Sequence, residues 1–137
     1  MAALNPFLHF TGNCFEAFQH YQRAFGGEFH NLMRYSEMPG ADSNVAASNG
    51  IVHIALPMPE GLHLQGSDYP PGMDGAIIGN NFTIVVNTKT EEESRRIFEI
   101  LSEGGKIVMP LEPTFWSPLY GMCDDKFGVG WMVSMAQ

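Results

Sequence analysis

Two segments of the chain carry apolar side chains at the spacing of one helical face. The first segment places them at Cys14, Ala17, Phe18, Tyr21 and Phe25. The second repeats four of these positions eighty residues later, at Ser94, Ile97, Phe98 and Leu101. This i, i+3, i+4, i+7 spacing predicts two amphipathic helices. The first covers residues 14–25, and the second starts after Thr90 and ends at about residue 103. Glycine pairs at 26–27 and 104–105 follow both segments, as is typical just past a helix C-terminus.

Short apolar segments around each helix predict strands. In the first half they are residues 4–10, 29–38, 50–56 and 62–66, and in the second half 82–87, 106–110, 117–123 and 131–135. Each half therefore has the order β-α-β-β-β, which predicts an α+β fold. One such half leaves an apolar sheet face uncovered, so it needs a partner. We predict a single domain with module one at 1–67, a linker at 68–79 and module two at 80–137.

Local signals support the two helix starts. Asn13 stands three residues before Glu16, and Thr90 stands three residues before Glu93, so both pairs predict a capping box. Pro6 is expected near a strand entry or a sheet edge. Residues 39–49 are polar and small, which predicts a loop.

Composition excludes several classes of protein. The 137 residues carry a net charge of −8, with 15 acidic against 7 basic residues and no cluster of Lys or Arg, so neither nucleic acid nor an anionic membrane is an expected partner. No apolar run is long enough to span a membrane, and the first residues lack a secretion-signal pattern. Cys14 and Cys123 fit neither a metal site nor a disulfide framework, so we expect a reduced, cytoplasmic protein.

Two motifs resemble those of PhnB-like proteins. Residues 5–28 read NPFLHFTGNCFEAFQHYQRAFGGE, and residues 112–131 match an ETFWxxxYGxxxDxFGVxW-type ending with Pro113 inserted. PhnB-like proteins are part of the vicinal oxygen chelate superfamily, with glyoxalase I, bleomycin-resistance proteins and extradiol dioxygenases. The resemblance covers nearly the whole chain. It implies two βαβββ modules forming a curved mixed sheet around a cavity, with helices outside, and commonly a homodimer.

The resemblance also implies where a divalent metal would bind. Catalytic members of the superfamily take ligands, typically His or Gln, Glu, His and Glu, from the first and last strands of each module. The matching positions here are Pro6 or His9, His63 or Gln65, Asn81, and Met132. No register supplies two carboxylates, which such a hard cation prefers. We therefore predict no metal cofactor, with a divalent metal as the less favoured option.

Histidines and aromatic side chains are the remaining candidates for a site. His9, His53 and His63 all lie in predicted strands, where they either converge, to bind zinc or act as acid and base, or form ordinary surface contacts. The aromatic residues near the C-terminal hairpin either fill a β-core or form one wall of a pocket. The predicted ligand pocket comprises His9, His53, His63, Gln65, Asn81, Phe115, Trp116, Tyr120 and Trp131.

Two classes of function remain. One is a metal-independent protein that binds a small, planar molecule in an aromatic cavity. The other is a metal-dependent isomerase, lyase or dioxygenase that acts on vicinal oxygens. The absent carboxylates favour the first class, although whether the chain is an enzyme stays open. Some PhnB-like proteins are labelled ubiquinone-pathway methyltransferases, but this chain has no strand, Gly-rich loop and helix to hold S-adenosylmethionine.

Overall fold

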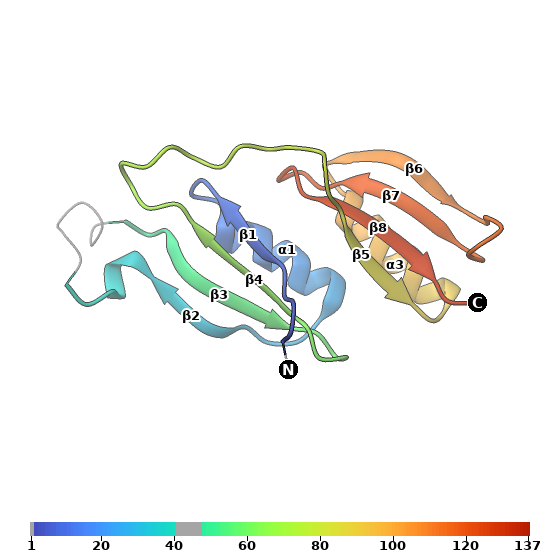
Figure 1. Ribbon diagram of the computed structural model, residues 1–137, viewed down its shortest axis with the longest axis horizontal. Helices are drawn as coiled ribbons and strands as arrows, with labels where there is room; N and C mark the ends of the chain where they lie inside the picture. The colour runs from blue at the N-terminus through green and yellow to red at the C-terminus, as the bar shows by residue number, and fades with distance from the viewer. Residues whose placement is uncertain (1, 41–47) are drawn as a thin grey trace. The chain divides into compact units, whose positions relative to one another are not determined.

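The computed structural model describes residues 2–40 and 48–137, so most of the predicted loop at 39–49 lies outside the described residues. The chain forms two compact units, Met1–Ile77 (unit 1) and Ile78–Gln137 (unit 2). The boundary between them falls within the predicted linker (Figure 1). In the described ranges, no helix has both the length and the hydrophobicity that crossing a bilayer requires.

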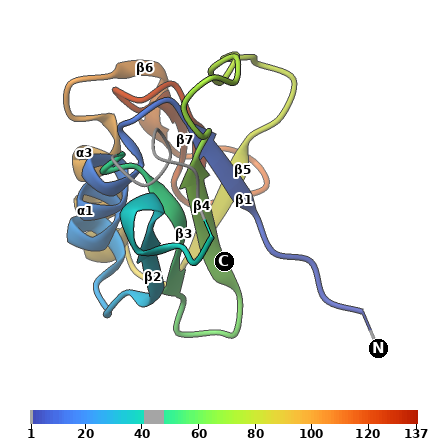
Figure 2. The same ribbon diagram turned by 90° about the vertical axis from the view of Figure 1, so that its left-hand side faces the viewer.

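Unit 1 is a four-stranded sheet covered on one face by a helix (Figure 2). Its elements are β1 (Phe7–Phe10), α1 (Cys14–Phe25), β2 (His30–Arg34), the 3-10 helix η1 (Tyr35–Glu37), β3 (Ile51–Pro57) and β4 (His63–Asp68). The strand order is β1-β4-β3-β2. The β1–β4 pair is parallel and the other two pairs are antiparallel, so the sheet is mixed.

Unit 2 repeats this arrangement. Its elements are β5 (Ile84–Thr88), α3 (Glu91–Ser102), β6 (Lys106–Glu112), β7 (Tyr120–Asp124) and β8 (Gly130–Met135). The strand order is β5-β8-β7-β6, again with one parallel pair, β5–β8. Two βαβββ modules of the α+β class are therefore confirmed. The cavity expected between the modules stays a prediction.

The two predicted helix faces form the cores of their units. The eight residues at the two sets of matching positions are between 0% and 6% exposed: Cys14, Ala17, Phe18, Tyr21, Ser94, Ile97, Phe98 and Leu101. A glycine opposite each phenylalanine lets helix and sheet approach closely. A Cβ at Gly66 would lie 2.6 Å from Phe18, and one at Gly121 would lie 3.0 Å from Phe98. Both contacts are closer than a side chain tolerates without repacking.

One of the two predicted capping boxes is wrong. Asn13 occupies the N-cap position of α1, but within the described chain its side chain makes no capping hydrogen bond. The carboxylate of Asp68, at the end of β4, accepts the first free N–H of α1 instead, from Cys14 at 3.0 Å. At α3 the predicted box forms in part: the Thr90 hydroxyl accepts the N–H of Glu93 at 3.1 Å, while the Glu93 carboxylate accepts the N–H of Lys89 at 3.2 Å.

Strand ends differ from the predictions for identifiable reasons. The predicted strand 29–38 stops at Arg34, and η1 follows. The Tyr35 hydroxyl of η1 donates a hydrogen bond to the Asp68 carbonyl at 2.7 Å. β6 runs past Pro110 to Glu112. β6 is an edge strand, and proline is tolerated there because an outward-facing position needs no N–H.

Both cysteines are free thiols inside the cores. Burial, and then the carboxylates of Asp125 and Asp124, raises the pKa of Cys123 to about 12. Burial, and then the Asp68 carboxylate, also raises the pKa of Cys14. A thiol that stays protonated is a poor nucleophile and a poor metal ligand. Neither cysteine is therefore a candidate for catalysis or metal binding.

These raised pKa values predict a loss of stability in alkaline solution. The folded state keeps each thiol protonated, whereas the unfolded chain releases the proton near pH 8.5, so stability is complete below that pH and declines above it. We expect the free energy of unfolding to fall by about 1 to 2 kcal/mol per thiol between pH 8 and 10. Urea unfolding of the wild type and of a Cys14→Ala/Cys123→Ala variant checks this, because the variant should show a smaller decline. Equal declines would contradict it.

Candidate functional site

The face of the unit 1 sheet that α1 does not cover carries the first group of candidate side chains. Along β1 the burial alternates, with Leu8 and Phe10 buried against α1, and Phe7 and His9 exposed on the other side. We call this side the helix-free face of unit 1. Any ligand of the unit 1 sheet would meet this face, because α1 fills the other.

His9 and His53 lie in one row across this face, on either side of Ser67. His9 is paired with Ser67 across the parallel β1–β4 ladder. In the antiparallel β3–β4 ladder, Ile54 pairs with Gly66, which places His53 opposite Ser67 as well. Two strand spacings separate the two histidines, so their Cα atoms are about 10 Å apart. Both imidazoles can therefore reach one small molecule lying over Ser67.

Aromatic rings surround this row. The ring of Phe7 lies 5.1 Å from that of His9 and 5.9 Å from that of His53, measured between centroids. Tyr69, the residue after β4, stacks on His9 at 4.9 Å with an interplanar angle of 13°. Such rings offer flat apolar surface at defined orientations. The helix-free face of unit 1 thus combines ring surface with polar groups that can bond to oxygen atoms.

The imidazole of His53 is held in place by its neighbours. Its Nε2 lies 3.0 Å from Gln65 Oε1, and its Nδ1 lies 3.4 Å from the carbonyl oxygen of Asn31. Asn31 has a φ of 55°, in a stretch of β2 where the register with β3 shifts, and this brings its carbonyl toward the ring. Gln65 therefore positions His53 and keeps its amide nitrogen available for a ligand.

His63 does not join the other two histidines. It opens β4 opposite Pro57, four residues before Ser67, which is about 13 Å along a strand. In residues 2–40 and 48–137, no three His, Cys, Asp or Glu side chains lie close enough to hold a metal ion. Of the two alternatives left open for the three histidines, His63 therefore fits the ordinary surface contact, while His9 and His53 share a face.

The helix-free face of the unit 2 sheet is apolar at its centre. Strand pairing places four side chains in one row across β5, β8, β7 and β6: Val85, Met132, Met122 and Met109. The Tyr120 hydroxyl donates a hydrogen bond to the Met132 sulfur at 3.3 Å. Methionine side chains adapt their shape to a bound surface. This face can accept apolar ligand surface.

Three of the predicted aromatic residues form a cluster beside this row. Trp116 packs edge-on against Tyr120 at 5.3 Å, and Phe115 packs edge-on against Trp116 at 4.7 Å. Phe115 is 93% exposed and Trp116 is 47% exposed, so both rings are accessible. Asn81 is also exposed, three residues before β5.

Trp131 lies in the core of unit 2 rather than on this face. It is 1% exposed, and its indole N–H donates to a carboxylate oxygen of Asp125 at 2.8 Å. Its strand neighbours in the register are Ile84 and Cys123, and Cys123 is buried as well. We therefore leave Trp131 out of the pocket, since its side chain packs on the α3 side of the sheet.

Sequence reasoning missed three contributors to the unit 1 face: Phe7, Ser67 and Tyr69. Phe7 is two residues before His9, so the period-2 alternation of a strand could have identified it. Ser67 and Tyr69 were not included in the predicted pocket because the strand that is β4 was predicted to end at residue 66. The longer strand results from the pairing of Ser67 and Asp68 with β1.

The donor groups do not fit the divalent metal site of the catalytic superfamily members. The helix-free face of unit 1 offers His9, His53 and the Gln65 amide. At the centre of the unit 2 face, Met132 stands where the resemblance places a carboxylate ligand. Thioethers are soft ligands, whereas Mn²⁺ and similar cations take carboxylate and water oxygens.

Comparison with known proteins agrees with the fold. The family model described as the Glyoxalase/Bleomycin resistance protein/Dioxygenase superfamily matches residues 3–133. Protein YjdN of Escherichia coli strain K12 is 33% identical over an alignment of 143 residues. The alignment covers 98% of this chain and 95% of YjdN.

Two solved structures are similar over almost their whole length. Protein PA1353 from Pseudomonas aeruginosa has a TM-score of 0.89 and 34% identity, covering 100% of this chain and 99% of PA1353. A protein from Bacillus cereus, described as a putative 3-demethylubiquinone-9 3-methyltransferase and PhnB protein, has a TM-score of 0.79 and 27% identity, covering 98% and 100%. Together with the two βαβββ modules, these matches show that the chain belongs to the glyoxalase/bleomycin resistance protein/dioxygenase superfamily.

Proposed function

We propose that this chain is a metal-independent, small-molecule-binding member of the superfamily, with the helix-free face of unit 1 as its main binding surface. The row of His9, Ser67 and His53, bordered by the rings of Phe7 and Tyr69, carries this proposal. A planar ring would stack on the aromatic side chains. Its oxygen atoms would accept hydrogen bonds from the imidazole of His9 and from the side-chain amide of Gln65, which also positions His53.

The chemistry of the donor groups supports binding without a metal. Imidazole, amide and hydroxyl groups bond directly to carbonyl or phenolic oxygens, so a quinone-like or hydroxyaromatic compound suits this surface. We also propose that the protein is cytoplasmic, since its two cysteines are free thiols. We propose a homodimer as well, on the resemblance to PhnB-like proteins.

A screen of aromatic and quinone-like compounds by thermal shift, followed by calorimetry on the hits, tests the proposal. For a compound that binds, His9→Ala and Phe7→Ala should each weaken binding by about tenfold, because the first removes one hydrogen bond and the second removes one ring contact. His63→Ala is the matched control, since His63 lies on the same strand as Gln65 but away from the row, and it should leave affinity unchanged. Equal losses in all three variants would contradict the assignment of the face.

Metal analysis of protein purified without chelator separates this function from the alternative. The proposal expects no stoichiometric zinc, nickel, manganese or iron, and the same affinity for the compound with and without EDTA. One bound metal ion per chain, with binding lost in EDTA, would instead favour a metal-dependent isomerase, lyase or dioxygenase.

A further inference from the structure

β6 is an apolar strand at the edge of the unit 2 sheet. It pairs with β7 on one side, and no strand of the described residues pairs with its other side (Figure 1). Ile107, Val108 and Met109 are 52%, 47% and 42% exposed. An exposed apolar edge strand is a ready template for another strand, and proteins leave one uncovered only where something pairs with it or blocks it.

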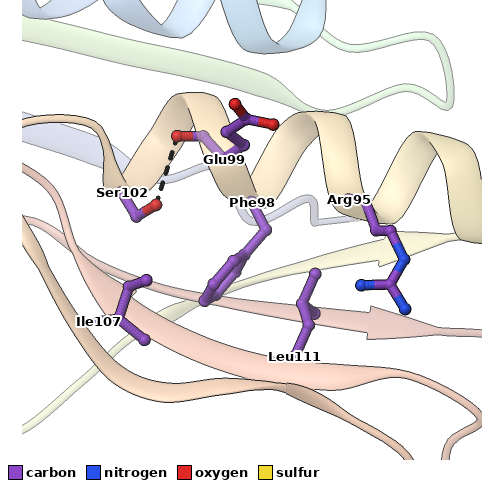
Figure 3. Close-up of a pocket in the computed structure, with 6 residues that line it drawn as sticks. All are labelled: Arg95, Phe98, Glu99, Ser102, Ile107 and Leu111. Atoms are coloured by element: carbon purple, nitrogen blue, oxygen red, sulfur yellow. Dashed lines mark hydrogen bonds between the residues drawn. The ribbon is translucent and has the colours of Figure 1, made fainter.

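A groove of about 350 Å³ runs beside this strand, between β6 and α3. Phe98 reaches from α3 toward β6, where Ile107 and Leu111 form the rest of the apolar floor (Figure 3). Arg95 and Glu99 lie along the rim. The exposed apolar surface of β6 therefore continues onto the helix side of the sheet.

The side chains of β6 alternate symmetrically about Met109. The residues that pair with β7 are Lys106 with Asp124, Ile107 with Cys123, Met109 with Met122 and Glu112 with Tyr120, with a register shift on each side of Met109. Lys106, Met109 and Glu112 consequently lie on the helix-free face. Ile107 and Leu111 lie on the α3 side, where both line the groove. Read in either direction, the strand presents the same order of faces.

We propose that β6 is the interface through which two copies of this chain associate, as an antiparallel pair of β6 strands about a two-fold axis at Met109. In that arrangement Lys106 of each copy lies opposite Glu112 of the other, and Ile107 lies opposite Leu111. Directly opposed residues of an antiparallel pair share a face, and opposite charges there are stabilising. The same patch is used by both copies, as two-fold symmetry requires. This inference specifies the surface of the proposed homodimer and does not depend on the ligand.

Charge complementarity favours a second copy over an unrelated strand. A parallel pair of β6 strands in register would place Lys106 opposite Lys106 and Glu112 opposite Glu112, which repel each other. The antiparallel pair instead places each Lys106 opposite a Glu112. β2, the corresponding edge of unit 1, has no acidic residue between His30 and Arg34 and lacks this self-complementarity. Pro110 offers no N–H to a partner strand, so we expect side-chain contacts to determine the direction and register of the β6 pair.

Charge reversal tests the interface in the full-length protein by size-exclusion chromatography with light scattering at low salt. Lys106→Glu and Glu112→Lys should each weaken dimerisation by at least about tenfold, because each creates two like-charge contacts in the symmetric dimer. The double variant should restore the wild-type dimer. Glu92→Lys, an equal change of charge on α3, should have no effect. Single variants that dimerise as well as the wild type, or a double variant that stays monomeric, would overturn the proposal.

A cysteine at the axis gives an independent readout. Opposed Cα atoms in an antiparallel pair are about 4.5 to 5.5 Å apart, which a disulfide can bridge. Met109→Cys should therefore form a covalent dimer under mild oxidation, while Val108→Cys, equally exposed but opposite Pro110, should form little. The native cysteines are buried and stay unreactive. A monomeric wild type would overturn the homodimer itself, whereas a wild-type dimer that Met109→Cys does not cross-link would overturn only the β6 interface.

Discussion

Replacing Asp68 with asparagine is expected to lower the free energy of unfolding of unit 1 by about 3 kcal/mol. Asp68 is 2% exposed, and its carboxylate accepts three backbone N–H groups. Gly12 and Cys14 donate to Oδ1 at 2.7 and 3.0 Å, and Ile51 donates to Oδ2 at 2.8 Å. Asparagine keeps one acceptor but turns an NH₂ group toward at least one of these donors. That donor is then buried without a partner.

Urea unfolding followed by far-ultraviolet circular dichroism measures this effect. Asp74→Asn is the matched control, because Asp74 is an exposed carboxylate of the same unit and should change stability by less than about 0.5 kcal/mol. A similarly small change for Asp68→Asn would show that the three hydrogen bonds contribute little to unit 1. It would also mean that the start of α1 does not depend on the Asp68 carboxylate for its stability.

The helices and the repeat of the fold could be predicted because their signals are local. Four buried positions in each helix follow the 3.6-residue period, and their offset of eighty residues identifies the two modules. Strand boundaries were predicted less well. Where a strand ends depends on its partners, as with Ser67 and Asp68, which extend β4 because β1 runs beside them.

The capping of α1 illustrates a limit of local reading. Asn13 has the residue type and the spacing of an N-cap, yet the acceptor comes from Asp68, more than fifty residues away in the sequence. Only the parallel pairing of β1 with β4 places that carboxylate at the helix N-terminus, where a negative charge is favourable. No local pattern predicts such a contact.

The site was predicted in part for a related reason. His9, His53 and Gln65 belong to adjacent strands, but only the register of those strands places the three side chains on one face. The aromatic composition of the C-terminal hairpin left open whether its four rings fill a core or form the wall of a pocket. A strand sends successive side chains to opposite faces, so Trp131 points into the core while Tyr120 lies on the helix-free face. Composition alone cannot tell these faces apart.

Unit 2 contains a second buried carboxylate that stabilises a turn instead of a helix start. Asp125 is 3% exposed, and its Oδ1 accepts the N–H groups of Phe127 at 2.8 Å and Val129 at 3.0 Å. Its Oδ2 accepts the indole N–H of Trp131 at 2.8 Å. One carboxylate thus joins the turn between β7 and β8 to the largest side chain of the core.

Asp125→Ala is therefore expected to destabilise unit 2 by about 3 kcal/mol, because three donors lose their acceptor and at least the indole N–H stays buried. Fluorescence reports the same change locally. In a Trp116→Phe background Trp131 is the remaining tryptophan, and its emission should move to longer wavelength as water reaches the ring. The neighbouring exposed carboxylate provides the control, since Asp124→Ala should leave both stability and emission nearly unchanged. If the two variants behaved alike, the turn would owe its conformation to the backbone, and the carboxylate of Asp125 would be dispensable.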